Sequence, residues 1–143
     1  MYAALRSVPA SDEVLGRLFH AASLLREHRG DGHIAALVTE RVGGLEAHVL
    51  LALDMGMPAE SFGRLHHLRP SHLASVIDGV RDRGLIGDDG WLSEQGRALK
   101  QRVEDLTDDL AARPYEALGP DELNELEDAL RPLAGWLLAA QDQ

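Results

Sequence analysis

Titratable side chains are concentrated in one short stretch of the chain. Residues 26–33 contain two histidines, two arginines and two carboxylates within eight consecutive positions. Imidazole titrates close to neutral pH, so with a neighbouring carboxylate it could move a proton as a general acid or base. Together with the guanidinium groups, the same side chains could instead hold an anionic small molecule. The residues that we assign to this ligand-binding site are Arg26, His28, Arg29, Asp31 and His33.

Two glycines lie inside this stretch and are expected to separate two helices. Gly30 and Gly32 disfavour a helix interior, and Asp31 between them is a suitable N-cap for the second helix. The free backbone N–H groups of that second helix could contribute to anion binding. A structural interpretation stays open beside the functional one, in which Asp31 is a cap and its neighbours form an exposed turn.

Other patterns that carry catalytic or metal chemistry are sparse. The chain has no cysteine, no glycine-rich phosphate loop and no nucleophile elbow. His28, His33 and Glu40 offer ligand types that zinc accepts, but their spacing matches no compact zinc motif. We therefore assign no catalytic residue, no metal and no cofactor. An enzyme that uses the histidine and carboxylate cluster remains an alternative.

A second group of polar residues lies on a predicted helix that begins near Arg69. Apolar residues recur at helical spacing between Leu73 and Val80, and Gly84 supplies a left-handed stop. The segment from Pro58 to Leu65 reads as a short helix, and two helices joined in this way place the second in a DNA major groove. The side chains positioned to contact DNA bases or phosphates are Arg64, Arg69, Ser71, His72, Ser75 and Arg81.

The residues after Gly84 predict a minimal two-stranded wing. Leu85 and Ile86 begin the first strand, residues 87–90 (Gly-Asp-Asp-Gly) form a tight turn, and Trp91 begins the second strand. The turn carries two negative charges, which DNA phosphates would repel.

Helical periodicity predicts further helices on both sides of this region. The expected spans are Ser11 to about His28, Ile34 to Val42, Leu45 to Met55, Ser93 to about Leu110, and a last helix from about Asp121. The expected fold class is all-α with a minimal two-stranded wing, in a single winged-helix domain over residues 1–143. Within it, the helix-turn-helix covers about 58–84, the wing about 85–92 and the C-terminal helices about 93–141.

The segment from Arg83 to Leu99 carries the most specific motif of the chain. It reads Arg-Gly-Leu-Ile, then the short wing, then Trp-Leu-Ser-Glu-Gln-Gly-Arg-Ala-Leu. This order resembles the MarR-type winged helix-turn-helix family, in which Leu-Thr-x-x-Gly-Arg follows the wing and Ser93 here replaces the threonine. A narrower resemblance is to a little-characterised bacterial helix-turn-helix group. It rests on the block LREHRGDGHIAALV, which ends at Val38, and on GLEAHVLLAL at residues 44–53.

The broader resemblance implies a ligand-responsive, DNA-binding transcriptional regulator of MarR type. It further implies a homodimer formed by the N- and C-terminal helices, with a small-molecule effector pocket between these helices and the winged region. The alternative is a small-molecule binding protein or cofactor-free enzyme on a winged-helix scaffold that has lost DNA binding, because the short acidic wing is unsuited to a phosphate backbone.

Composition narrows the partners and the location that we expect. The net charge is −10 over 143 residues, but ten of the acids lie between residues 104 and 128, where Arg113 is the one basic residue. The half expected to read DNA is therefore nearly neutral. No apolar run approaches the roughly 20 residues of a bilayer span, so we expect no membrane partner. A cytoplasmic location is expected, and the absence of cysteine is consistent with a reducing compartment.

Overall fold

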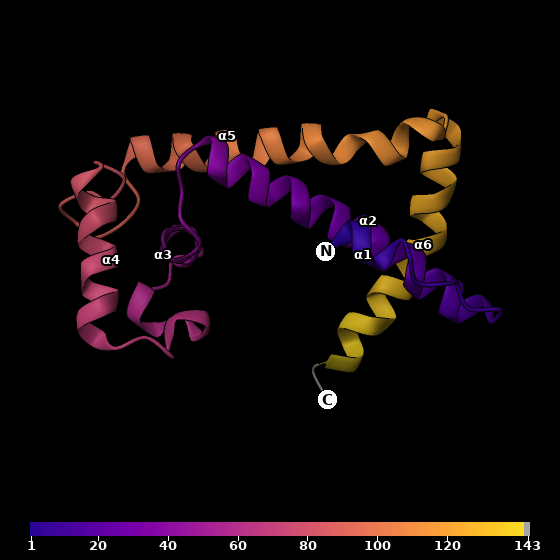
Figure 1. Ribbon diagram of the computed structural model, residues 1–143, viewed down its shortest axis with the longest axis horizontal. Helices are drawn as coiled ribbons and strands as arrows, with labels where there is room; N and C mark the ends of the chain where they lie inside the picture. The colour runs from indigo at the N-terminus through magenta and orange to yellow at the C-terminus, as the bar shows by residue number, and fades with distance from the viewer. Residues whose placement is uncertain (142–143) are drawn as a thin grey trace. The chain divides into compact units, whose positions relative to one another are not determined.

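The computed structural model describes residues 1–141, and helices dominate this part of the chain. The chain divides into two compact units, residues 1–111 and the residues from 112 onward, and each is described here by itself. The first unit contains α1 (Tyr2–Leu5), α2 (Val14–Thr39), α3 (Gly44–Asp54), the 3-10 turns η1 (Ala59–Ser61) and η2 (Gly63–Leu65), α4 (Pro70–Asp82) and α5 (Glu94–Ala112, of which the last residue falls in the second unit) (Figure 1). The second unit contains η3 (Arg113–Ala117) and α6 (Pro120–Gln141).

None of the helices among residues 1–141 combines the length and the apolar character needed to cross a bilayer.

The longest helix, α2, contradicts the predicted break at residues 30–32. It runs without interruption from Val14 to Thr39, so Asp31 caps no helix and the expected anion site at a helix N-terminus does not exist. A glycine inside a helix costs about 1 kcal/mol, which packing can offset. A Cβ at Gly32 would lie 3.2 Å from the Leu110 Cβ, so this glycine lets α2 approach α5 closely.

The core of the first unit gathers around α3, which is apolar on most of its surface. Val49 and Leu50 are buried, and the core extends through Leu65 to α4 and α5. The start of α3 is held by Glu46, whose Oε2 accepts the Gly43 N–H at 2.7 Å and also pairs with Arg83 Nη1 at 3.0 Å. This carboxylate therefore ties the beginning of α3 to the end of α4.

The segment predicted as one short helix, Pro58 to Leu65, forms two 3-10 turns instead. Phe62 separates them with an extended backbone, at φ −80° and ψ 116°. The Ser61 N–H donates to the Pro58 carbonyl at 2.9 Å, and the Leu65 N–H donates to the Phe62 carbonyl at 2.8 Å. The change of direction at Phe62 allows the apolar residues on both turns, Ala59 and Leu65, to be buried at 2% and 1% exposure.

The predicted stop of α4 at Gly84 is confirmed. Gly84 has φ +73°, its N–H donates to the Arg81 carbonyl at 2.8 Å, and the Leu85 N–H donates to the Val80 carbonyl at 3.3 Å. This pair of bonds is the Schellman arrangement, which needs a left-handed residue that glycine supplies without strain.

The predicted two-stranded wing is wrong in its extent. Among the described residues, one isolated antiparallel bridge joins Ile86 to Leu92 and no strand ladder forms. Residues 87–90 are used by the turn, closed by the Gly90 N–H donating to the Gly87 carbonyl at 3.0 Å. Ser93 caps α5 immediately after Leu92. Too few residues therefore remain outside the turn and the helix to extend the strand pairing.

Ser93 joins the hairpin to α5 and caps that helix, which was predicted to begin at this residue. Its Oγ accepts the Gly96 N–H at 3.0 Å and donates to the Gly84 carbonyl at 2.6 Å. A Cβ at Gly96 would lie 2.2 Å from the Leu85 carbonyl oxygen, so only glycine fits at that point. The end of α4 and the start of α5 are thereby connected through a single hydroxyl and a close backbone approach.

In the second unit, α6 is continuous through Pro132. Glu122 Oε2 accepts the Gly119 N–H at 2.8 Å at its beginning. Its apolar residues recur at helical spacing but stay largely exposed, among them Leu126, Leu130 and Leu133.

Candidate functional site

The outward face of α4 carries a row of polar side chains. Leu73 and Val80 on the opposite face are buried against the core. Arg69 is the N-cap residue and Pro70 is the first residue of the helix, which favours helix initiation at this point. The predicted base-contacting residues on this face are all exposed: Arg69, Ser71, His72 and Ser75.

The two arginines predicted to contact phosphates differ in their surroundings. Arg64 is exposed on η2, five residues before Arg69. Arg81 Nη1 pairs with Asp78 Oδ1 at 2.7 Å, so its charge is partly compensated on α4 itself. The structure therefore leaves Arg64 as the less compensated of the two cations.

The hairpin after α4 remains acidic and exposed. Asp88 and Asp89 are both solvent-accessible. Asp89 Oδ1 also accepts the Trp91 N–H at 3.0 Å, which stabilises the turn. One of the two acids thus has a structural role.

The charged cluster at residues 26–33 is not assembled into one site. Arg29 Nη2 pairs with Glu104 Oε2 and with Asp108 Oδ1 on α5, each at 3.1 Å, and the bond with Glu104 is the main reason that the pKa of Arg29 is raised. Arg26 pairs with its neighbour Glu27. Arg26 and Arg29 are three residues apart on α2 and share a face of the helix, but their ion-pair partners lie on different elements, so the two guanidinium groups do not converge on one site.

The remaining members of the cluster also have separate partners. Asp31 accepts hydrogen bonds from the Met1 ammonium at 3.1 Å and from the Tyr2 N–H at 3.2 Å, and the ammonium bond is the main cause of its lowered pKa. His33 Nδ1 lies 3.0 Å from Thr107 Oγ1, a buried hydroxyl that donates to the Val103 carbonyl. The ring centroids of His28 and Tyr2 are 5.0 Å apart. Nε2 of His28 is buried without a hydrogen-bond partner among the described residues.

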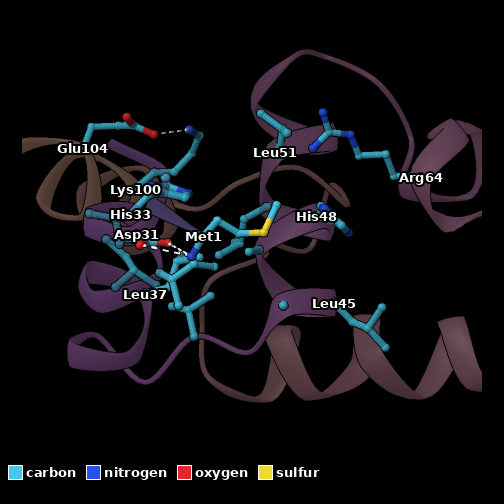
Figure 2. A pocket seen from close by; sticks show the side chains of 18 of the residues that line it. Met1, Asp31, His33, Leu37, Leu45, His48, Leu51, Arg64, Lys100 and Glu104 are labelled. Atoms are coloured by element: carbon cyan, nitrogen blue, oxygen red, sulfur yellow. Dashed lines mark hydrogen bonds and ion pairs between the residues drawn. The ribbon is translucent and has the colours of Figure 1, made fainter. Parts of the chain in front are cut away.

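A cavity of about 880 Å³ lies in the first unit between α2, α3, α5 and η2 (Figure 2). Of the five predicted ligand-binding residues, Asp31 and His33 line it, whereas Arg26, His28 and Arg29 do not. Most of its wall is apolar. The aliphatic lining residues include Ile34, Leu37, Val42, Leu45, Leu50, Leu51, Leu99 and Val103.

The most unusual polar residue on the cavity wall is His48, because its Nδ1 is buried with no hydrogen-bond partner among the described residues. Its ring lies 6.2 Å from the ring of Phe62. Burial is the main cause of its lowered pKa, followed by the nearby positive charges of Arg64 and His67. The signal available in the sequence was a lone histidine in a nearly continuous apolar helix.

Comparison with protein-family models gave a match over residues 1–143 to a model described as a helix-turn-helix family. The chain belongs to this helix-turn-helix family. Searches of curated proteins and of solved structures gave no match. Membership supports the general class of DNA-binding regulator and agrees with the two turns and α4 at residues 59–82.

Among residues 1–141, no group of three or more histidine, aspartate or glutamate side chains is arranged to hold a metal ion.

Proposed function

We propose that this helix-turn-helix protein is a DNA-binding transcriptional regulator that responds to a small molecule, in the manner of MarR-type regulators. The observation that carries the proposal is the polar row on α4, opposite a buried apolar face. A helix held in this way can enter the major groove while its scaffold stays rigid.

The chemistry of the row fits base and phosphate contacts. Arg69 could pair with the O6 and N7 atoms of guanine, and Ser71 or Ser75 could bond to several bases. His72 supplies a ring whose hydrogen bonds depend on its tautomer. Arg64 on η2 is available for a phosphate.

A homodimer is part of the proposal because two regions expose apolar side chains at helical spacing. At the beginning of α2, Val14, Leu15 and Phe19 are 69–76% exposed. On α6, Trp136 and Leu137 are exposed to 68% and 50%. Exposed apolar patches of this kind mark interaction surfaces, and a two-fold dimer would place two copies of α4 on successive major grooves about 34 Å apart.

The test is binding to duplexes that the protein itself enriches from a random-sequence pool, measured by fluorescence anisotropy over a range of salt concentrations. We expect affinity to fall steeply as salt rises, with a logarithmic slope of about −0.9 for each phosphate contacted. Arg69→Ala should weaken binding, and His72→Ala should change the enriched sequence. Arg113→Ala on η3 is the matched control, which should leave both unchanged. Failure to enrich any sequence would reject the proposal that the protein is a DNA-binding regulator.

The alternative is a small-molecule binding protein that no longer contacts DNA. The volume and apolar lining of the cavity favour it, as do the exposed acids of the hairpin. Stabilisation by an apolar compound, in the absence of any DNA enrichment, would select this alternative.

A further inference from the structure

The charged groups around the cavity differ between its two sides. On the side formed by α2 and α5, the charges are compensated by neighbours. Lys100 Nζ pairs with Asp54 Oδ2 at 3.2 Å and with Glu104 Oε1 at 3.6 Å. Asp31 and Glu27 have the partners described above. A ligand on this side would have to break an existing ion pair to gain a new one.

The side formed by α3 and η2 carries one cation, Arg64, without such compensation. Figure 2 shows His48, Leu51 and Arg64 on this side, across the cavity from Asp31 and Lys100. Within residues 1–141, neither Arg64 nor His67 forms an ion pair or a side-chain hydrogen bond, and Nδ1 of His48 has no partner. No acidic side chain lines the cavity from α3 or η2.

We propose that the cavity binds an amphipathic anion, with an apolar body among the leucines and a carboxylate, sulfonate or phosphate group paired with Arg64. The aliphatic wall sets the first requirement, and the uncompensated guanidinium sets the second. Aromatic bodies fit as well as aliphatic ones, since the cavity exceeds the 300 Å³ lower bound typical of small-molecule sites by about threefold.

Arg64 also connects this cavity to the DNA-reading helix. It is exposed, lies on η2 just before α4, and is one of the residues assigned to phosphate contact. One guanidinium cannot pair fully with a ligand anion and with a DNA phosphate at the same time. Anion binding therefore weakens DNA binding through Arg64, and by linkage DNA weakens anion binding by the same factor. This second half of the inference rests on the proposed function.

The first experiment uses two fluorescent probes with the same aromatic skeleton. Anilinonaphthalene sulfonate carries one negative charge, and phenylnaphthylamine is its uncharged parent. We expect Arg64→Gln to weaken binding of the sulfonate by about tenfold, the size of one charge-assisted contact. Binding of phenylnaphthylamine should change less than twofold, because the apolar wall is intact.

Two further variants locate the probes. Ala47→Leu adds volume to the cavity wall, and Gly30→Leu does so at a position where a new Cβ would meet no atom within 4 Å. Each of these variants should weaken the binding of both probes. Thermal unfolding checks that each variant is folded. If both probes bind these variants as tightly as the wild type, they occupy the exposed apolar helices instead, and the inference is rejected.

The second experiment measures DNA affinity with and without saturating sulfonate. We expect about a tenfold loss of DNA affinity for the wild type and less than twofold for Arg64→Gln. Arg69→Gln is the control, because it lies outside the cavity lining and should weaken DNA binding while leaving sulfonate binding unchanged.

The outcomes separate the inference from the proposed function. Sulfonate binding that ignores Arg64→Gln overturns the anion site. If sulfonate binding depends on Arg64 but leaves DNA affinity unchanged, the proposal that ligand and DNA share this arginine is overturned. If the protein binds no DNA under any condition, the proposed function as a regulator is overturned. The comparison of the two probes still tests the anion site in that case.

Discussion

The two compact units bury their apolar side chains to very different degrees. In the first unit, α5 places Leu99, Val103 and Ala111 in the core at 8% exposure or less. In the second unit, Leu126 and Leu130 on α6 are 39% and 37% exposed, and no described residue from 112 to 140 is buried. The first unit therefore has a hydrophobic core of its own, and the second must gain most of its stability from another surface.

Helical periodicity is similar in these two regions although their surroundings differ. A stripe of apolar residues indicates that a helix covers something, but it does not indicate whether the covered surface belongs to the same chain or to a second copy. The contrast between α5 and α6 is our main reason for expecting a dimer, and the following predictions test that contrast.

The largest effect is expected in the core of the first unit. Leu65 is 1% exposed and belongs to the core cluster where η2 packs on α3. Leu65→Ala should lower the free energy of unfolding by about 2–5 kcal/mol, because it removes buried methyl groups and leaves a cavity. Urea denaturation at constant protein concentration measures this loss. A change below 1 kcal/mol would mean that this unit is less tightly packed than its burial indicates.

A charge introduced on α6 should weaken dimerisation and leave the core of the first unit unchanged. Leu130→Glu should raise the dimer dissociation constant by about a hundredfold, since a carboxylate would be buried at the interface. Sedimentation over a range of concentrations measures it, with Asn124→Glu as a control that adds the same charge. A wild type that is monomeric at micromolar concentration would remove the basis of this prediction.

A pair of glycine substitutions should measure how closely α2 packs on α5. Gly30→Ala should stabilise the protein by about 0.5–1 kcal/mol, because it removes an unfavourable residue from a helix interior where a Cβ has free space. Gly32→Ala should gain less or nothing, since its Cβ would press on Leu110. Thermal unfolding of the two variants provides the comparison. Equal gains would show that the α2–α5 approach is looser than described.

The smallest effect is a pH dependence confined to the first unit, which contains all seven histidines. The lowered pKa of His48 means that the unfolded chain binds a proton there more readily than the folded protein. The free energy of unfolding should therefore fall as pH drops below about 6.5 and recover above it. His48→Phe should flatten this part of the profile, and Arg64→Gln should reduce its slope because Arg64 contributes to the lowered pKa.

That pH dependence should be absent from assembly. The dimer dissociation constant should be the same for the wild type and for His48→Phe between pH 5.5 and 7.5, because His48 is on α3 whereas the apolar residues proposed for the interface are on α2 and α6. Sedimentation at the two pH values is the measurement, and a difference between the variants would place His48 near the interface.

Local chemistry explains which features could be predicted from the sequence. The stop at Gly84 and the cap at Ser93 depend on backbone conformation and on bonds within a few residues, so the residue types alone indicate them. The continuity of α2 could not be predicted in this way. It depends on packing against α5, more than 70 residues later in the chain, which offsets the local cost of two glycines.

The candidate site was harder to predict for the same reason. Arg29 and His33 are close in sequence, but their partners, Asp108 and Thr107, belong to α5. The environment of His48 depends on Arg64 and His67, which only folding brings near it. The polar row on α4 could be placed from helical periodicity, whereas the cavity between α2, α3, α5 and η2 required the three-dimensional arrangement.

Ser93 and Gly96, which connect α4 to α5, show that a residue can indicate family membership without taking part in DNA binding. The segment that most resembles winged-helix regulators is fixed by one hydroxyl with two bonds and by a carbonyl that leaves no room for a methyl group. Neither requirement involves nucleic acid. A descendant that had stopped reading DNA would still need both residues to hold α4 on α5, whereas Arg69 and His72 would be free to drift. Ser93 and Gly96 therefore indicate which family the chain belongs to, whereas Arg69 and His72 would indicate whether it still binds DNA.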